Sequence, residues 1–337
     1  MDFKHTIVFD VNGNDKGVLE CFLAAQEFAN NNPTYKIKLV GDVAELKELN
    51  NFANIELIEN KNKPTDPKNI RKTLQENTSM NQAIEILKNN EADGIISSGD
   101  SGSYLSALTL KMKRLQNVSR PAFMPVANAI NGQKFVFMDV GANLETKPEY
   151  LIEWAKLASA FYQTMFATNY PRVALLNIGT EDYKGPEATK KAHQYLTNDK
   201  SINYVGFHET RDVFRGHYDV AIIDGYAGNI MLKSYEGAIS TFKDTLKTSI
   251  MSKLKYKLGA LLLKGAFKEV AATLDYRSVG SAWVVGVNAL AVKTHGASDK
   301  KAYLSGLNSL KNAIENNLLN KLQKATENLE INLEESE

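Results

Sequence analysis

The stretch that decides the fold is Asp219-Val-Ala-Ile-Ile-Asp-Gly-Tyr-Ala-Gly-Asn-Ile-Met-Leu-Lys233. Residues 220–223 form a short, uninterrupted apolar run, which is typical of a strand buried on both faces of a parallel sheet. The pair Asp224-Gly225 ends this run. A strand that ends in this way and leads into a helix marks the edge at which open α/β sheets bind ligands. The stretch therefore predicts an α/β fold with a ligand site beyond this strand.

The second half of the stretch predicts a turn followed by a helix. Gly228 and Asn229 supply a flexible point, and helical apolar spacing begins at residue 230. Free backbone amides at the start of a helix can bind an anion, and Lys233 could point back toward that position. The same residues could also form an ordinary turn between a strand and a helix, because glycines in loops serve backbone geometry first.

Composition narrows the class of protein. The chain has 337 residues, of which 43% are apolar and 23% charged, so it can bury a large core. Its net charge of +1 indicates no nucleic-acid partner. Cys21 is the only cysteine, the N-terminus leads into a strand without a signal peptide, and no apolar run reaches the roughly 20 residues of a membrane span. We therefore expect a soluble, cytoplasmic protein.

Strand and helix patterns alternate along the chain. Short apolar runs predict strands at residues 6–9, 36–40, 55–58, 94–97, 136–138 and 173–177. Helical patterns cover residues 18–30 and 80–88, and another ends near residue 49. This alternation predicts an α/β domain around a mostly parallel sheet with right-handed crossovers. We place this single domain at residues 1–320, followed by a helix end and an acidic tail at residues 321–337.

Glycine and polar residues follow four of the predicted strands. They occupy residues 99–102, 141–143, 179–185 and 225–229. The carboxyl ends of parallel strands lie on one edge of a sheet, so these loops could converge. Backbone amides in such turns bind phosphate and other small anions. Together the four loops indicate a phosphate or small-anion site, whereas one of them alone would be weak evidence.

Several other motifs are incomplete. Residues 99–102 resemble the serine loop of chymotrypsin-type proteases, but that class requires an all-β chain, whereas the context here is α/β and His5 is the only histidine upstream. A dinucleotide fingerprint and a Walker loop are absent, and the five histidines lack metal-ligand spacing. Asp10, Asp139 and Asp224 could hold Mg²⁺, but helix capping is the favoured role. We therefore expect no metal and no cofactor.

Two long segments carry a family resemblance. Residues 171–185, Pro-Arg-Val-Ala-Leu-Leu-Asn-Ile-Gly-Thr-Glu-Asp-Tyr-Lys-Gly, resemble a signature of the PlsX phosphate acyltransferase family. Residues 224–237 resemble a second signature of that family. Shorter matches lie at residues 120–122, 138–143 and 294–299, so the resemblance runs from Asp10 to about Ile314.

The resemblance implies a specific enzyme. PlsX proteins transfer a long-chain acyl group from the thioester of acyl carrier protein to inorganic phosphate, which gives acyl phosphate for phospholipid synthesis. Their fold has three layers and is similar to that of isocitrate and isopropylmalate dehydrogenases. By resemblance, we expect a homodimer, without a cofactor, that associates peripherally with the inner face of the cell membrane. A downstream membrane glycerol-3-phosphate acyltransferase is a further candidate partner.

This reaction requires hydrogen-bond donors rather than an activated nucleophile, because phosphate is already an anion at neutral pH. Donors must hold both the phosphate and the oxyanion of the tetrahedral intermediate. The expected catalytic residues are Lys184, Asn229 and Asp224. The expected phosphate- and acyl-binding residues are Gly99, Ser101, Gly102, Asn143, Gly179 and Gly228. Lys184 could instead be a surface lysine, and Asn229 could occupy a turn.

Some residues depart from the family pattern. Residues 10–15 lack one glycine of a usual pair, and Asp100 stands where asparagine is usual. A carboxylate there would disfavour an anion unless it points away, caps a helix or pairs with a cation. Trp283, at a common proline position, could narrow the acyl path. Two alternatives stay open: a phosphate acyltransferase for short-chain coenzyme A thioesters, and a non-catalytic homologue that docks at the membrane.

The pattern changes at residues 238–272, where we expect two linked helices that project from the domain. Apolar residues recur there at helical spacing and alternate with seven lysines. Four leucines between the helices are too apolar for a solvated tip: Leu258, Leu261, Leu262 and Leu263. They could dip into an anionic membrane surface or pack in a dimer core. The lysines could bind either lipid or an acidic acyl carrier protein.

Overall fold

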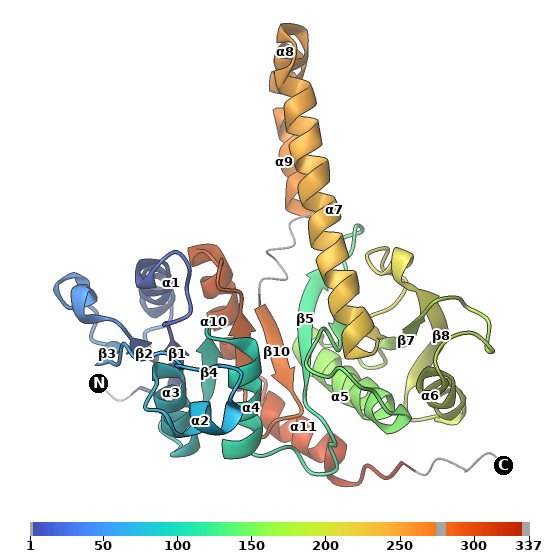
Figure 1. Ribbon diagram of the computed structural model, residues 1–337, viewed down its shortest axis with the longest axis horizontal. Helices are drawn as coiled ribbons and strands as arrows, with labels where there is room; N and C mark the ends of the chain where they lie inside the picture. Colours follow the sequence, from blue (N-terminus) through green and yellow to red (C-terminus); the bar gives the residue numbers. More distant parts are fainter. Residues whose placement is uncertain (1–2, 274–280, 332–337) are drawn as a thin grey trace.

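The computed structural model describes residues 3–273 and 281–331, whose strands join in one 11-stranded sheet (Figure 1). The strands are β1 (His5–Asp10), β2 (Tyr35–Gly41), β3 (Ile55–Glu59), β4 (Gly94–Ser97), β5 (Ala122–Asn128), β6 (Lys134–Met138), β7 (Arg172–Asn177), β8 (Asn203–Glu209), β9 (Val220–Ile222), β10 (Ser281–Val285) and β11 (Ala291–Thr294). They lie in the order β3-β2-β1-β4-β11-β10-β5-β6-β9-β7-β8. Neighbouring strands are parallel except at the centre, where β10 is antiparallel to β11 and β5, and β5 to β6.

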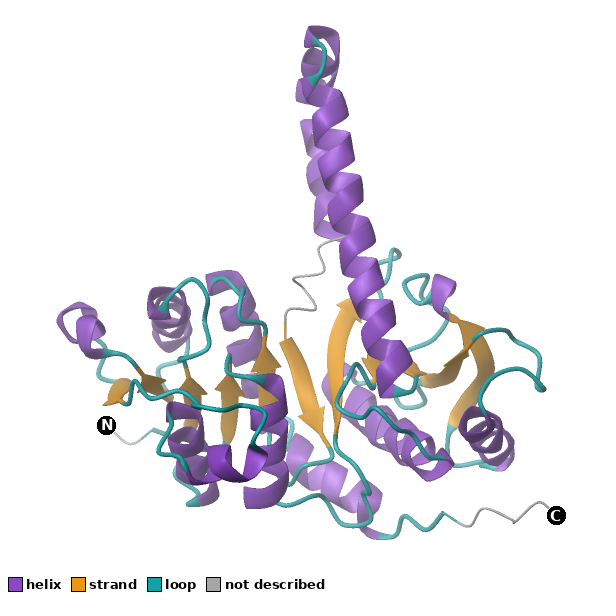
Figure 2. Ribbon diagram, viewed as in Figure 1, coloured by secondary structure: helices purple, strands orange, loops and turns teal. Residues whose placement is uncertain are grey.

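Helices cover both faces of this sheet (Figure 2). They are α1 (Val18–Asn31), α2 (Ile70–Gln75), α3 (Ser79–Lys88), α4 (Ser101–Lys111), α5 (Pro148–Phe166), α6 (Glu187–Asn198), α7 (Gly225–Met251), α8 (Leu254–Leu262), α9 (Lys264–Thr273), α10 (Lys300–Glu315) and α11 (Leu318–Glu327). On one face, α1, α5, α6, α10 and α11 share a core cluster. On the other face, α3 and α4 pack on one half of the sheet and α7 on the other half.

The strands are buried on both faces, as their continuous apolar runs predict. In β1, Ile7 and Phe9 join the core beneath α1 and α10, whereas Val8 joins the core beneath α3 and α4. In β7, Val173 and Ala174 likewise point to opposite faces. Successive side chains of a strand alternate in this way, so helices on both faces require apolar residues at every position. The predicted fold class, a three-layer α/β structure with a mostly parallel sheet, is confirmed.

Helix α7 begins earlier than the sequence pattern indicated. It starts at Gly225, and Asp224 caps it by accepting a hydrogen bond from the Ala227 amide at 2.8 Å. The predicted turn at residues 228–229 is therefore wrong, because both residues lie in the helix. Gly228 is required by packing instead: a Cβ atom there would lie 1.9 Å from the carbonyl oxygen of Asp139. The glycines of this motif let α7 approach the loop after β6 closely.

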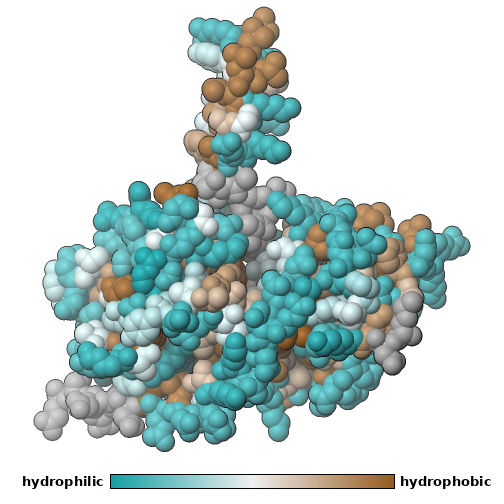
Figure 3. Space-filling view, turned by 180° about the vertical axis from the view of Figure 1, so that it is seen from behind, coloured by the Kyte–Doolittle hydropathy of each residue, from teal (hydrophilic) through white to brown (hydrophobic). Residues whose placement is uncertain are grey.

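The predicted hairpin projects from the domain, but its tip is helical. The chain leaves the body along α7, turns through α8 and runs back in α9 (Figure 1). We expected Leu258 to Leu263 to link two helices, whereas α8 already contains residues up to Leu262. Figure 3 shows apolar side chains gathered at the end of this column. Among the described residues, no helix is both long enough and apolar enough to cross a bilayer.

The C-terminal helix belongs to the domain. Helix α11 contacts α5, and its Leu318 and Leu322 are buried in the main core. The expected boundary at residue 320 therefore falls inside a helix. The residues from 329 to 331 follow the end of α11, and most of the predicted acidic tail, residues 332–337, lies outside the described residues.

Candidate active site

A cavity of about 470 Å³ lies over the central strands β5, β10 and β11, between α4 and α7, and is within the size range of ligand pockets. Its walls come from α4, β5, the loop after β6, α7, β10, β11 and the loop that leads into α10. One wall is apolar and consists of Phe123, Pro125, Val140, Leu232, Ala282 and Ala302. The remaining wall carries polar groups, among them Ser101, Asn229, Lys233, Lys293, His295 and Ser298. An apolar molecule with a polar end would fit these surroundings.

Helix α4 presents its amino end near this cavity. Asp100 caps the helix, since its Oδ1 accepts hydrogen bonds from the amide and the hydroxyl of Ser103, both at 2.8 Å. The first-turn amides of Ser101 and Gly102 have no acceptor within the helix. Ser101 lines the cavity, as expected for a binding residue. The Gly99 amide instead donates to the Ser97 hydroxyl at 3.0 Å, so this amide serves the loop.

Asp139 organises the loop after β6 and does not cap a helix, contrary to the favoured interpretation. Its buried carboxylate accepts hydrogen bonds from the amides of Phe123 (3.0 Å), Ala142 (3.0 Å) and Asn143 (2.9 Å). Burial raises the pKa of Asp139, and these hydrogen bonds oppose that rise. The Asn143 side-chain amide donates to Asp139 and to the Pro121 carbonyl. Asn143 therefore holds the loop rather than facing the cavity.

Asn229 is the fifth residue of α7 and lines the cavity. Its side chain packs against Gly141, where a Cβ atom would lie 3.2 Å from the Asn229 Cβ. Gly141 has a φ of 119°, which L side chains rarely adopt. Within the described residues, the Asn229 side-chain amide has no hydrogen-bond partner, so it is available to a ligand.

Lys184 and Gly179 belong to the loop after β7 and do not line the cavity. The Lys184 ammonium pairs with Glu181 at 2.7 Å, and both side chains are exposed. Gly179 packs against the Lys184 side chain, since a Cβ atom there would lie 2.5 Å from its Cδ. The Asn177 side-chain amide donates to the Lys184 carbonyl at 2.9 Å. The predicted site residues thus fall into two groups, one at the cavity and one on this neighbouring loop.

The sequence analysis missed Lys293, the most buried cation of the cavity. Lys293 lies in β11, is 9% exposed, and donates to the carbonyl oxygen of Thr294. Burial lowers the pKa of its ammonium to about 8, and nearby carboxylates, that of Asp10 first among them, oppose this shift. A lysine within the apolar run of a strand was the available signal. The run Ala-Val-Lys-Thr is too short to show it without knowledge of the fold.

Asp10 is close enough to Lys293 to affect its pKa. Contrary to the favoured interpretation, Asp10 caps no helix. Its carboxylate accepts hydrogen bonds from the Ser79 and Ser97 hydroxyls, each at 2.6 Å. Burial raises its pKa, and the two hydroxyl donors oppose the rise. Asp10 therefore ties the end of β1 to the end of β4 and to α3.

Trp283 does not narrow the cavity. It points to the opposite face of β10, where it packs edge-on against Phe161 at 5.4 Å between ring centroids. Its neighbour Ala282 faces the cavity instead, because side chains alternate along a strand. The hypothesis that the tryptophan shapes the acyl path is therefore wrong.

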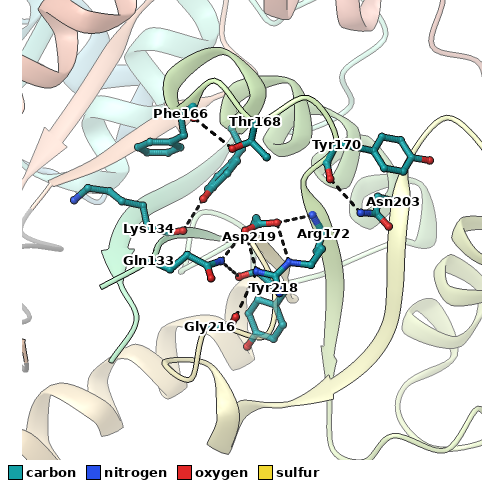
Figure 4. Close-up of polar contacts among 11 residues, drawn as sticks. Gln133, Lys134, Phe166, Thr168, Tyr170, Arg172, Asn203, Gly216, Tyr218 and Asp219 are labelled. Atoms are coloured by element: carbon teal, nitrogen blue, oxygen red, sulfur yellow. Dashed lines mark hydrogen bonds and ion pairs between the residues drawn. The ribbon is translucent and has the colours of Figure 1, made fainter. Parts of the chain in front are cut away.

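Arg172, the arginine of the family-like segment at residues 171–185, has a structural role. Asp219 accepts hydrogen bonds from the Arg172 amide (2.7 Å), its Nε (3.1 Å) and its Nη2 (3.1 Å), and from Gln133 (2.7 Å) (Figure 4). Arg172 begins β7 and Asp219 precedes β9, so this network joins the amino ends of two parallel strands. Neither Arg172 nor Asp219 lines the cavity.

Comparisons with known proteins agree along the whole chain. The family model described as "Fatty acid synthesis protein" matches residues 5–321. A phosphate acyltransferase from Mycoplasmopsis agalactiae is 53% identical over 325 residues, which span 95% of this chain and 97% of that protein. A phosphate acyltransferase from Mycoplasma mobile is 46% identical over 93% of this chain and 97% of its own length.

Solved structures at low identity share the fold. A branched-chain phosphotransacylase from Enterococcus faecalis aligns with a TM-score of 0.59 at 12% identity, over 92% of this chain and 99% of that one. A structure from Salmonella typhimurium, provisionally assigned as a 4-hydroxythreonine-4-phosphate dehydrogenase, aligns with a TM-score of 0.53 at 11% identity. The alignment covers 92% of this chain and 100% of that one. The expected likeness to a dehydrogenase fold is confirmed at the level of architecture.

Proposed function

This chain belongs to the phosphate acyltransferase family, and we propose that its acyl donor is the long-chain thioester of acyl carrier protein. The product is acyl phosphate, a precursor in phospholipid synthesis. The observation that supports this proposal is the cavity over the central strands, where an apolar wall adjoins amide, hydroxyl and ammonium groups. A fatty acyl thioester needs the apolar wall, and phosphate needs the polar groups.

In the proposed reaction, a phosphate oxygen attacks the thioester carbonyl carbon. A carbon–oxygen bond forms, the carbon–sulfur bond breaks, and the thiolate of the carrier leaves and takes up a proton. Asn229 donates to the oxyanion of the intermediate, a contribution typically of about 3 kcal/mol. Asp224 touches no substrate in this scheme but positions Asn229 by capping α7. Lys184 supplies a second donor when it leaves its exposed ion pair with Glu181, which is a weak interaction.

The test is an assay of the purified protein with inorganic phosphate and either palmitoyl-acyl carrier protein or butyryl-coenzyme A. Acyl phosphate formed preferentially from the carrier thioester supports the proposal. Turnover of the coenzyme A ester alone would instead identify a short-chain enzyme. Lack of turnover with both donors would favour a non-catalytic docking homologue.

We further propose that the hairpin tip binds the membrane surface. Leu258, Leu261, Leu262 and Leu263 are 60%, 68%, 88% and 55% exposed, although α8 is an apolar helix. Lysines flank them on both sides, at Lys253, Lys255, Lys257 and Lys264. Exposed leucines beside lysines are typical of segments that lie in the headgroup region, where each lysine contributes about 1 kcal/mol on anionic lipid. Such an attachment would be peripheral, at the inner face of the cell membrane.

The double substitution Leu261→Glu with Leu262→Glu separates this role from packing. We expect the variant to remain active in solution and to lose flotation with vesicles that contain anionic lipid. Substitution of Leu49, an exposed leucine on the body, by glutamate is the matched control and should not alter flotation. A variant that dissociates from a dimer or aggregates would show that these leucines form a dimer core.

Two partners complete the proposal. The hairpin lysines could also bind an acidic acyl carrier protein. In that case raised salt would slow association with the carrier protein as well as weaken flotation with vesicles. A homodimer beside the bilayer would release acyl phosphate where a membrane enzyme could pass the acyl group to glycerol 3-phosphate. Sizing of the wild-type protein tests the dimer directly.

A further inference from the structure

Two buried polar side chains at the inner end of the cavity lack the partners that burial normally requires. The hydroxyl of Ser298 has no hydrogen-bond partner, although Ser298 is 6% exposed. The ammonium of Lys293, 9% exposed, can donate three hydrogen bonds, and the hydrogen bond found for it goes to the carbonyl oxygen of Thr294. Unpaired buried polar groups are costly, so sites that retain them commonly bind a ligand. Both residues line the same cavity.

The amino end of α4 adds donors to this place. Ser101, the first residue of the helix, lines the cavity together with Lys293 and Ser298. Its amide and that of Gly102 lack acceptors within the helix, and the helix dipole favours a negative charge there. An ammonium group, a hydroxyl and a helix amino end therefore line the same cavity, a combination that suits a small oxyanion.

The charges around Lys293 favour its protonated form near neutral pH. Burial lowers its pKa to about 8, while the carboxylates of Asp10, Asp100 and Asp15 oppose that shift. Two of these carboxylates already accept other donors: Asp10 from two serine hydroxyls, and Asp100 from Ser103. These hydrogen bonds partly compensate the negative charge of the two carboxylates. The ammonium of Lys293 is therefore the group that is available to bind an anion.

Other charged groups at the cavity are engaged elsewhere. On α7, Lys233 is paired with Glu236 at 2.8 Å. Before α10, Asp299 caps that helix by accepting from the Ala302 amide at 3.1 Å. Lys184 lies outside the cavity. Lys293 is thus the lysine of the cavity that the described residues leave without a carboxylate in direct contact.

We propose that inorganic phosphate, the acyl acceptor, binds at the inner end of the cavity, held by Lys293, Ser298 and the first-turn amides of α4. The thioester then lies along the apolar wall, with its carbonyl oxygen directed to Asn229. This assignment rests on the family reaction and specifies where the acceptor binds, whichever thioester is the donor. It divides the cavity into an inner anion subsite and an outer acyl subsite.

Calorimetric titration with inorganic phosphate tests the subsite without any acyl donor. Lys293→Met, which keeps an unbranched side chain that is one atom shorter, should weaken phosphate binding by about tenfold to a hundredfold, because one charge-assisted donor is lost. Ser298→Ala should weaken it about threefold to tenfold. Lys111→Met is the matched control: Lys111 is partly shielded and pairs with Glu85 away from the cavity, so phosphate affinity should not change.

A second readout is the pH dependence of phosphate affinity. Since Lys293 is charged only below a pKa of about 8, wild-type phosphate affinity should fall as the pH rises above that value. Lys293→Met should abolish this fall. Thermal unfolding checks that each variant is folded, and Ser298→Ala, which removes a single oxygen atom, provides the test should Lys293→Met not fold.

The proposal is overturned if folded Ser298→Ala and Lys293→Met bind phosphate as tightly as the wild-type protein. Failure of the carrier-protein proposal would look different: wild-type protein would still bind phosphate but would not use palmitoyl-acyl carrier protein. In steady-state assays with any active donor, the variants should raise the KM for phosphate and leave the KM for the donor nearly unchanged. The opposite pattern would place the phosphate elsewhere.

Discussion

Two regions of the molecule treat polar side chains in opposite ways. Beside the first residues of β7 and β9, Asp219 collects four hydrogen bonds from Arg172 and Gln133, so its buried charge is matched within the protein. At the cavity, the Ser298 hydroxyl has no hydrogen-bond partner among the described residues. Lys293, also buried there, is hydrogen-bonded to a single backbone carbonyl. Both regions contain residues of the segments that resemble the family motifs.

This difference separates residues that hold the fold from residues that meet a substrate. A polar group whose partners all come from the protein contributes to stability, and its loss is felt in unfolding. A buried polar group left without partners lowers stability and is available to a ligand. Motif membership alone does not distinguish the two, since Arg172 and Lys184 stand in the same segment.

The largest expected effect on the reaction rate concerns Lys184, the proposed second donor to the oxyanion. Lys184→Ala should lower the rate of acyl phosphate formation about tenfold to a thousandfold and leave the unfolding free energy nearly unchanged, because its exposed ion pair contributes little to stability. Steady-state kinetics and chemical denaturation measure the two quantities. Glu181→Gln is the matched control, since it frees Lys184 and should preserve activity. Wild-type kinetics in Lys184→Ala would assign Lys184 to the surface and confine the chemistry to the cavity.

A smaller and opposite effect is expected at the hydrogen bonds between Arg172 and Asp219. Arg172→Ala removes two side-chain hydrogen bonds to a buried carboxylate and should lower the unfolding free energy by about 2 kcal/mol, with kcat and KM unchanged below the unfolding transition. Denaturant titration gives the first quantity and the acyl phosphate assay the second. Lys190→Ala, which breaks an exposed ion pair with Glu187, should cost less than about 0.5 kcal/mol. A folded Arg172→Ala with impaired turnover would contradict the division between the two regions.

Much of the fold could be predicted from local patterns. The apolar runs of β1, β4 and β7 are continuous because helices cover both faces, and the limits of these strands and of β2 were found within one or two residues. The central antiparallel strands β5, β10 and β11 were not recognised. Their pairing is set by distant partners, as when Ala282 pairs with both Pro125 and Lys293. Sequence spacing carries no signal for such contacts.

The site was predictable in part for the same reason. Ser101 and Asn229 follow strand ends and line the cavity, but β4 and β9 run in opposite directions, so the single shared edge from which their convergence was predicted is wrong. Gly228 was interpreted as a turn because its true constraint, the nearby Asp139 carbonyl, belongs to another loop. Lys293 escaped notice because burial depends on the surrounding layers, which a four-residue strand does not reveal.

The most direct test of the central claim asks whether both substrates must meet in the cavity before the thioester breaks. Direct attack by phosphate is expected because Cys21 is buried, with its pKa raised to about 12, and so is not a competent nucleophile. The cavity serines are the remaining candidates for an acyl-enzyme. Enzyme in stoichiometric amount should release no free carrier from palmitoyl-acyl carrier protein until phosphate is added, and then release carrier and acyl phosphate together. A stoichiometric burst of free carrier before phosphate is present would contradict the account.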